Sequence, residues 1–125
     1  MQLNGFPQNA ECDMIAGRPL DFEVAKGYAK LRFNIEEQFD EESGQQNGWK
    51  YSEVGFVIVP TKTIKQMAKK AIINAMYSLD DEEGMKHDYD AVMAGVSDDD
   101  EAVDIYMAFL QFREDINTML QDFVG

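Results

Sequence analysis

Carboxylates are the most numerous chemically active side chains in this sequence, and many of them gather in two clusters. The first cluster follows Ser78 and comprises Asp80, Asp81, Glu82 and Glu83, and the second follows Ser97 and comprises Asp98, Asp99, Asp100 and Glu101. Clustered carboxylate oxygens suit hard cations, so the three aspartates of the second cluster, together with Asp104, are candidate Ca²⁺ ligands. The spacing of an EF-hand loop, with its central glycine and closing glutamate, is absent from the sequence.

Helix capping explains both carboxylate clusters without a metal ion. A serine hydroxyl accepts a hydrogen bond from a free N–H group at a helix start, and the carboxylates that follow it meet the positive end of the helix dipole. Ser78 and Ser97 each stand directly before an acidic run and a longer helical pattern. We therefore predict two capped helix starts and no metal site.

The remaining reactive side chains do not form a recognisable catalytic set. His87 is the only histidine, and neighbouring Asp88 would point in a different direction on a helix, which makes the two a poor acid–base pair. Cys12 is the only cysteine, which excludes an internal disulfide and a thiol pair for metal or redox chemistry. The sequence has no glycine-rich phosphate loop, paired-histidine zinc motif or serine-nucleophile elbow. We predict no catalytic residues, no cofactor and no small-molecule substrate.

Charge is distributed unevenly along the 125 residues, whose formal net charge is −13. Residues 1–78 carry ten acidic and nine basic side chains, whereas residues 79–125 carry fourteen acidic and two basic ones. Binding to phosphates requires clustered lysine and arginine, so direct contact with nucleic acid is not expected. Four lysines between positions 62 and 70 line the back of one predicted helix, and we interpret them as a solvated face.

The strongest structural pattern covers the end of the chain and predicts a helix at about 99–123. Its apolar stripe has the alternating three- and four-residue gaps of an amphipathic helix: Ala102, Ile105, Phe109, Phe112, Ile116, Met119 and Phe123. A second apolar set lies off this stripe: Val103, Tyr106, Met107 and Leu110. We predict that Tyr106, Met107 and Leu110 form a partner interface; the competing interpretation is that the helix at about 62–77 covers them within the same chain.

Residues 20–59 carry the two-residue alternation of an antiparallel sheet with two or three strands. Leu20 to Val24 and Ala29 to Ile35 alternate, and a polar loop at 40–48 leads to a return strand that ends at Val59. The apolar run in this last strand predicts a central strand covered on both faces. Gly55 within it indicates either a β-bulge or the close approach of a helix.

These patterns together predict an α+β fold in which the small sheet packs against helices at about 62–77, 80–94 and 99–123. Residues 1–19 have no sustained period and predict an irregular N-terminal arm, with Phe6, Met14 and Ile15 as candidate anchors. Residues 20–125 predict a single domain, since domains commonly contain about 100–150 residues. The sequence has no signal-peptide pattern and no apolar run of membrane-spanning length, so we expect a cytoplasmic protein without a membrane partner.

Two segments of the chain resemble a group of phage proteins. They read TIKQMAKKAIINAMYSLDDEEGMKHDYDAVMAG and DIYMAFLQFREDINTML, and the second contains an aromatic-x-x-aromatic-Arg-Glu pattern at Phe109–Glu114. Over roughly residues 28–122 the chain resembles small uncharacterised proteins encoded among the structural and tail genes of phages and prophages of gut Bacteroidetes. The resemblance implies a virion or tail-assembly accessory protein without catalytic residues. It would lie in the host cytoplasm during assembly and then in the virion, in contact with other phage structural proteins or with itself.

A rival hypothesis comes from the acidity of residues 79–125. An acidic protein can act as a DNA mimic, in which carboxylates imitate phosphates and occupy a nucleic-acid-binding protein. Such a protein needs carboxylates spread over one continuous surface. Eight of the fourteen acidic residues after position 78 belong to the two clusters at predicted helix starts, which favours capping.

Overall fold

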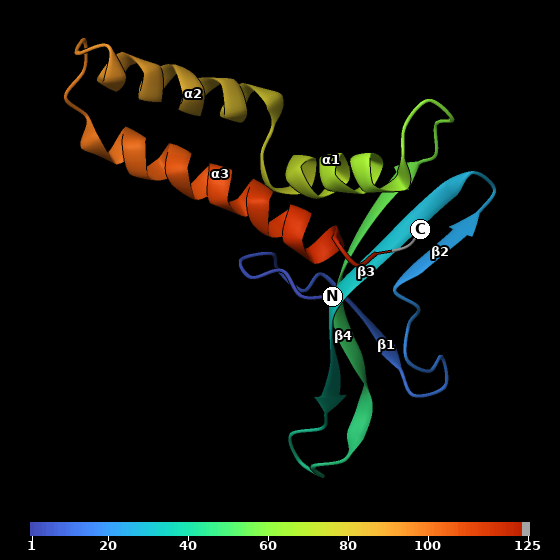
Figure 1. The fold of residues 1–125 in the computed structure, drawn as a ribbon. Coiled ribbons are helices and arrows are strands. Elements are labelled where there is room, and N and C mark those ends of the chain that lie inside the picture. The colour runs from blue at the N-terminus through green and yellow to red at the C-terminus, as the bar shows by residue number, and fades with distance from the viewer. Residues whose placement is uncertain (124–125) are drawn as a thin grey trace.

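The computed structural model describes residues 1–123, which form an antiparallel sheet with three helices (Figure 1). The elements are β1 (Ala10–Asp13), β2 (Phe22–Ala25), β3 (Tyr28–Phe39), β4 (Gln46–Val57), α1 (Ile64–Met76), α2 (Leu79–Met93) and α3 (Asp100–Leu120). The strand order is β1-β4-β3-β2, and every neighbouring pair is antiparallel. The α+β class and the three helices agree with the prediction, but the sheet has four strands in place of two or three.

The additional strand, β1, lies within the segment predicted to be an irregular arm. Its four residues pair with the start of β4, from Ala10 opposite Tyr51 to Asp13 opposite Gly48. Ala10 and Cys12 alternate with Glu11 and Asp13, but the prediction took this short run as irregular because Gly5, Pro7, Gly17 and Pro19 surround it. Phe6 is buried as predicted, whereas Met14 and Ile15 are exposed.

Asn34 anchors the first residues of the chain to the sheet. Its side-chain oxygen accepts a hydrogen bond from the Leu3 N–H (2.7 Å), and its amide donates to the Leu3 carbonyl (3.0 Å) and to the Ser52 hydroxyl (3.2 Å). Asn34 has a positive φ of 54° and lies where the β3–β4 register shifts, so a β-bulge turns its side chain toward the arm. The Asn34 amide also donates to the Phe6 carbonyl (3.5 Å), and the side chains of Leu3 and Phe6 both belong to the core.

The core lies between one face of β3 and β4 and the helices α1 and α3. Leu31, Phe33 and Val54 belong to it from the sheet, together with Ile72 from α1 and Ile116 from α3. These residues follow the predicted alternation of the strands and the predicted apolar faces of the helices. α2 lies outside this sandwich, alongside α3 (Figure 1).

β4 is an inner strand of the sheet, as predicted, but over residues 54–57 only its helix-facing side is covered. Val57 is 67% exposed, and Gly55 is exposed as well, so the prediction that both faces are covered was wrong. A Cβ atom at Gly55 would lie 2.1 Å from the Tyr28 hydroxyl, because the Tyr28 side chain lies across this position. The glycine therefore accommodates a neighbouring tyrosine, and neither a bulge nor a helix occupies that space.

Capping residues define the starts of α1 and α2. The Thr63 hydroxyl accepts from the Gln66 N–H, the Ser78 hydroxyl accepts from the Asp81 N–H, and both helices have a complete capping box. The predicted cap at Ser78 is confirmed. At α3 the N-cap is Asp99, whose side chain makes no capping bond within the described chain, and Ser97 instead accepts a bond from the Asp99 N–H (3.2 Å). Of the helices within residues 1–123, none combines the length and the apolar character needed to cross a membrane.

Candidate protein-contact surface

α2 and α3 form an antiparallel helical hairpin whose far end projects beyond the sheet (Figure 1). The connection uses Gly95 at a φ of 76°, and the Ala91 carbonyl accepts bonds from the N–H groups of Val96 (2.9 Å) and Ser97 (3.1 Å). Glycine suits this position because L-residues with side chains rarely adopt a positive φ. The first two turns of α3 are thereby held against α2, beyond the core that begins with Phe109.

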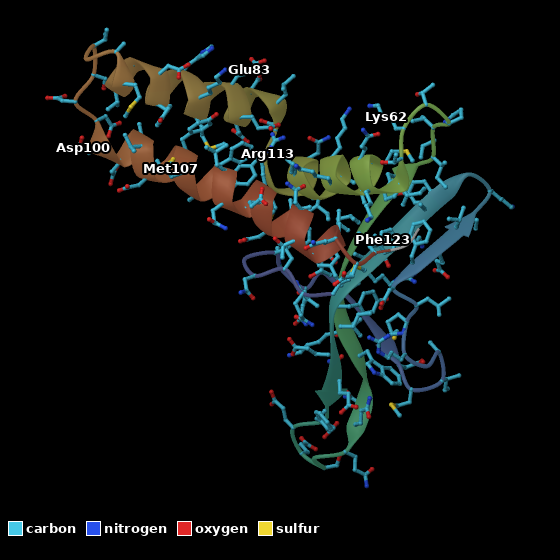
Figure 2. The ribbon with its side chains drawn as sticks, in the orientation of Figure 1. Lys62, Glu83, Asp100, Met107, Arg113 and Phe123 are labelled. Carbon is cyan, nitrogen blue, oxygen red and sulfur yellow. The ribbon has the colours of Figure 1, made fainter. Side chains whose placement is uncertain are left out.

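Aromatic and charged contacts hold the two helices of the hairpin together. The rings of Tyr89 and Tyr106 lie 4.8 Å apart between their centroids, and Arg113 pairs with Glu82 at 3.6 Å. Figure 2 places Arg113 near the start of α2, where the three helices meet, and its guanidinium lies 5.8 Å from the centre of the Phe109 ring. Within residues 1–123, α2 contributes no fully buried residue. α2 therefore buries little apolar surface against α3.

The three residues predicted to form a partner interface lie in two different environments. Tyr106 is half-buried against Tyr89 of α2, so the helix that covers it within the chain is α2 and not α1. A partner contact through its exposed part stays a prediction. Met107 is 54% exposed and Leu110 is 39% exposed. Val103, Met107 and Leu110 are spaced four and three residues apart, which places them on one side of α3. We call these three residues the α3 strip.

Three further apolar side chains of the projecting hairpin are exposed, and the sequence did not identify them as surface residues. Ile105 belongs to the predicted core stripe but is 52% exposed, and Met93 and Val96 are exposed near the turn. The 21 residues of α3 extend about 32 Å, whereas four strands span about 15 Å of sheet width. A helix longer than the sheet is wide cannot bury its whole stripe, so the helix length was the signal for an exposed Ile105.

The acidic clusters occupy opposite ends of the hairpin, because the two helices are antiparallel. Figure 2 shows Glu83 near the start of α2 and Asp100 at the far end, where α3 begins. Hydrogen bonds from the backbone N–H and the hydroxyl of Ser78 hold the pKa of Asp81 below its usual value. In the part of the chain that the structure describes, no group of three His, Cys, Asp or Glu side chains is arranged to hold a metal ion.

The other candidate reactive residues lie apart from one another. Cys12 is on β1, where its thiol donates to the Gly17 carbonyl at 3.5 Å, and His87 is exposed on α2. Neither residue joins a cluster of groups that could perform acid–base or nucleophilic chemistry.

Arg32 is a buried charged residue on the sheet face opposite the helices, and no sequence pattern identified it as a structural residue. It donates to Glu53 at 2.8 Å, to Glu23 at 2.6 Å and to the Leu20 carbonyl at 3.2 Å. Burial acts to lower the pKa of Arg32, but the hydrogen bonds to Glu53 and Glu23 raise it overall. The hydrogen bond and the charge of Arg32 lower the pKa of Glu23. Because its partners come from β2, β4 and the segment before β2, Arg32 holds these parts of the sheet together.

The chain matches no known protein-family description, no curated protein and no solved structure.

Proposed function

We propose that this protein is a non-enzymatic phage structural or virion and tail-assembly accessory protein that acts through protein–protein contacts made by the α2–α3 hairpin. The observation that carries the proposal is the α3 strip, whose residues Met107 and Leu110 are exposed on a helix that projects from the folded core. The assignment to phage assembly comes from the resemblance over residues 28–122. On this proposal the protein lies in the host cytoplasm during assembly and then in the virion.

The α3 strip has the composition of a small contact surface. Full burial of a methionine or leucine side chain contributes about 1.5–3 kcal/mol, so a partner that covers the exposed parts of Met107 and Leu110 would gain about 1 kcal/mol from each. Methionine also adapts to irregular partner surfaces, because its side chain is unbranched and flexible. Ile105, Met93 and Val96 supply further apolar surface on the same projecting part of the hairpin.

Salt dependence distinguishes self-association from binding to another structural protein of the particle. The hairpin carries the acidic residues of the C-terminal third, so two copies in contact would repel one another, and added salt would strengthen their association. A basic structural protein of the particle would be attracted to the same charge, and added salt would weaken that contact.

Mass spectrometry of purified particles of the phage that encodes the chain tests the assignment. We expect the chain in stoichiometric amounts relative to known particle proteins. Detection of the protein only in the soluble fraction of infected cells would contradict a structural role.

The DNA-mimic alternative has weaker support. Asp81 is bonded to Ser78 and Glu82 pairs with Arg113, so both carboxylates are engaged within the chain. The two clusters also lie at opposite ends of the hairpin, with apolar residues of the α3 strip between them. A mimic would bind a basic nucleic-acid-binding protein with an affinity that falls steeply between low and moderate salt, and salt-insensitive binding would exclude it.

A further inference from the structure

Part of the β4 edge lacks a neighbouring strand. β1 pairs with Gly48 to Tyr51, and the Asn9 side chain extends this cover to Glu53. Its oxygen accepts a hydrogen bond from the Glu53 N–H (2.8 Å), and its amide donates to the Glu53 carbonyl (3.0 Å). The Asn9 N–H also donates to the Tyr51 carbonyl at 3.0 Å. The backbone groups of Tyr51 and Glu53 therefore point toward the β1 side of β4.

The same two-residue alternation directs the backbone groups of Gly55 and Val57 to this side. Ile58, one residue further, points the other way, since its N–H donates to the Gly27 carbonyl at 2.9 Å. Within residues 1–123 no strand pairs with this edge beyond Glu53, and both Gly55 and Val57 are exposed. An open edge of this kind is a template for pairing with another extended chain.

α1 forms the opposite wall of a groove along this open edge. The groove has a volume of about 470 Å³ and is lined by Gly55, Phe56, Val57, Val59, Lys62, Met67, Lys70, Ala71, Asn74 and Ala75. The small side chains of Ala71 and Ala75 leave room beside the strand. The Val59 N–H donates to the Met67 sulfur at 3.3 Å, so the free part of the edge ends where α1 begins to cover it. We call this site the β4–α1 groove.

The charge of the β4–α1 groove is opposite to that of the protein. Lys62 and Lys70 line it, and no Asp or Glu of the described residues does, although the chain has 24 acidic and 11 basic residues. Figure 2 shows Lys62 in the connection between β4 and α1. Lysines at this position favour an acidic occupant.

We propose that the β4–α1 groove binds an extended acidic segment of a partner protein, which adds to the sheet as a strand beside residues 54–57 of β4. Backbone hydrogen bonds to Gly55 and Val57 provide affinity, apolar side chains of the segment fill the space beside Ala71 and Ala75, and its carboxylates meet Lys62 and Lys70. The acidic clusters of this chain lie at helix starts, so a second copy offers no extended acidic strand from them. The inference goes beyond the proposed function, because it uses a surface separate from the α3 strip.

A displayed library of random ten-residue peptides, selected on the full-length protein, tests this proposal. The test variant is Lys62→Glu/Lys70→Glu, and the matched control is Lys65→Glu/Lys86→Glu, which reverses the same number of exposed lysines on α1 and α2 at positions that do not line the groove. We expect the recovered peptides to be rich in Asp and Glu. We also expect their affinity to fall at least tenfold in the test variant and to change less than twofold in the control.

Amide hydrogen exchange with a recovered acidic peptide gives an independent readout. Binding should slow exchange at the Gly55 and Val57 amides. The proposal is overturned by a selection that yields no binders or no acidic enrichment, by equal affinity for the test and control variants, or by protection elsewhere. Concentration-dependent protection of these two amides without any peptide would also overturn it, because a second copy would then occupy the groove.

Discussion

The two halves of α3 carry the same apolar pattern in different surroundings. In the C-terminal half, Phe112, Ile116 and Met119 are buried in the core that the sheet and α1 complete. In the N-terminal half, Ala102 and Phe109 are buried, but Ile105 and Met107 are more than half exposed. The neighbouring helix there is α2, which contributes no fully buried residue in the described chain. One half of α3 therefore stabilises the fold, and the other half presents apolar surface on a projecting arm.

This difference predicts a gradient of local stability along the helix. Regions with few buried apolar contacts open with a smaller free energy than the core does. α2 depends instead on its capping box, on Arg113–Glu82, on the contact between Tyr89 and Tyr106 and on the partly buried Met85. The hairpin should therefore exchange its amide hydrogens faster than the C-terminal half of α3.

The largest expected effect comes from a matched pair of substitutions on the α3 stripe. Ile116→Ala should lower the free energy of unfolding by about 2–5 kcal/mol, because Ile116 is fully buried and its truncation leaves a cavity. Ile105→Ala, eleven residues earlier on the same stripe, should cost less than about 1 kcal/mol, because Ile105 is half exposed. Chemical denaturation measures both. Equal costs would contradict the difference between the two halves.

Asn34→Ala should have the next largest effect. The change leaves the buried Leu3 N–H and carbonyl without their partners and places alanine at a positive φ, which together should cost about 2–4 kcal/mol. Denaturation gives the total, and hydrogen exchange at Leu3 reports whether the arm has detached. Unchanged protection at Leu3 would show that Asn34 does not anchor the arm.

Ser78→Ala removes the N-cap of α2 and should cost about 1 kcal/mol. Because α2 buries little apolar surface against α3, the loss of the cap should appear as faster amide exchange across the whole of α2. Thr63→Ala, which removes the corresponding cap of α1, is the matched control, since core contacts of α1 should limit the change to its first turn. Faster exchange confined to the first turn of α2 would mean that the hairpin is more stable than we infer.

The smallest effect is a pH dependence at the sheet face opposite the helices. The hydrogen bond and the charge of Arg32 lower the folded-state pKa of Glu23 below its ordinary value of 4.5, so the Glu23–Arg32 contact stabilises the fold above pH 4.5. This stabilisation is lost as the pH falls through the folded-state pKa. The free energies of unfolding of the wild type and of Glu23→Gln should therefore converge below pH 4.5. A difference that stays constant down to pH 3 would contradict the assignment.

Local patterns in the sequence determine much of this fold, because they depend on neighbouring residues. Ser78 with Asp81 identified the start of α2, and the alternation around Leu31 and Phe33 identified β3. The local apolar pattern did not predict the exposure of Ile105 and of Val57, since both have the apolar neighbours of a buried residue. Their exposure depends on how far α3 extends past the sheet and on which sheet face the helices cover.

The candidate contact surface was predicted only in part for the same reason. Met107 and Leu110 were identified because they lie off the core stripe, and the structure leaves both exposed. Tyr106 has the same sequence signature but faces Tyr89, whose position depends on the turn between α2 and α3. The open edge of β4 could not be found from the sequence, because it depends on where the short β1 begins and ends.

The most direct test of the central claim is a Met107→Asp/Leu110→Asp variant, assayed for folding and for assembly in parallel. We expect its free energy of unfolding to stay within about 1 kcal/mol of the wild type, because both side chains are already exposed. Its incorporation into particles, or its self-association in analytical ultracentrifugation, should be lost. A variant that unfolds, or one that assembles as the wild type does, would show that the α3 strip is not a contact surface.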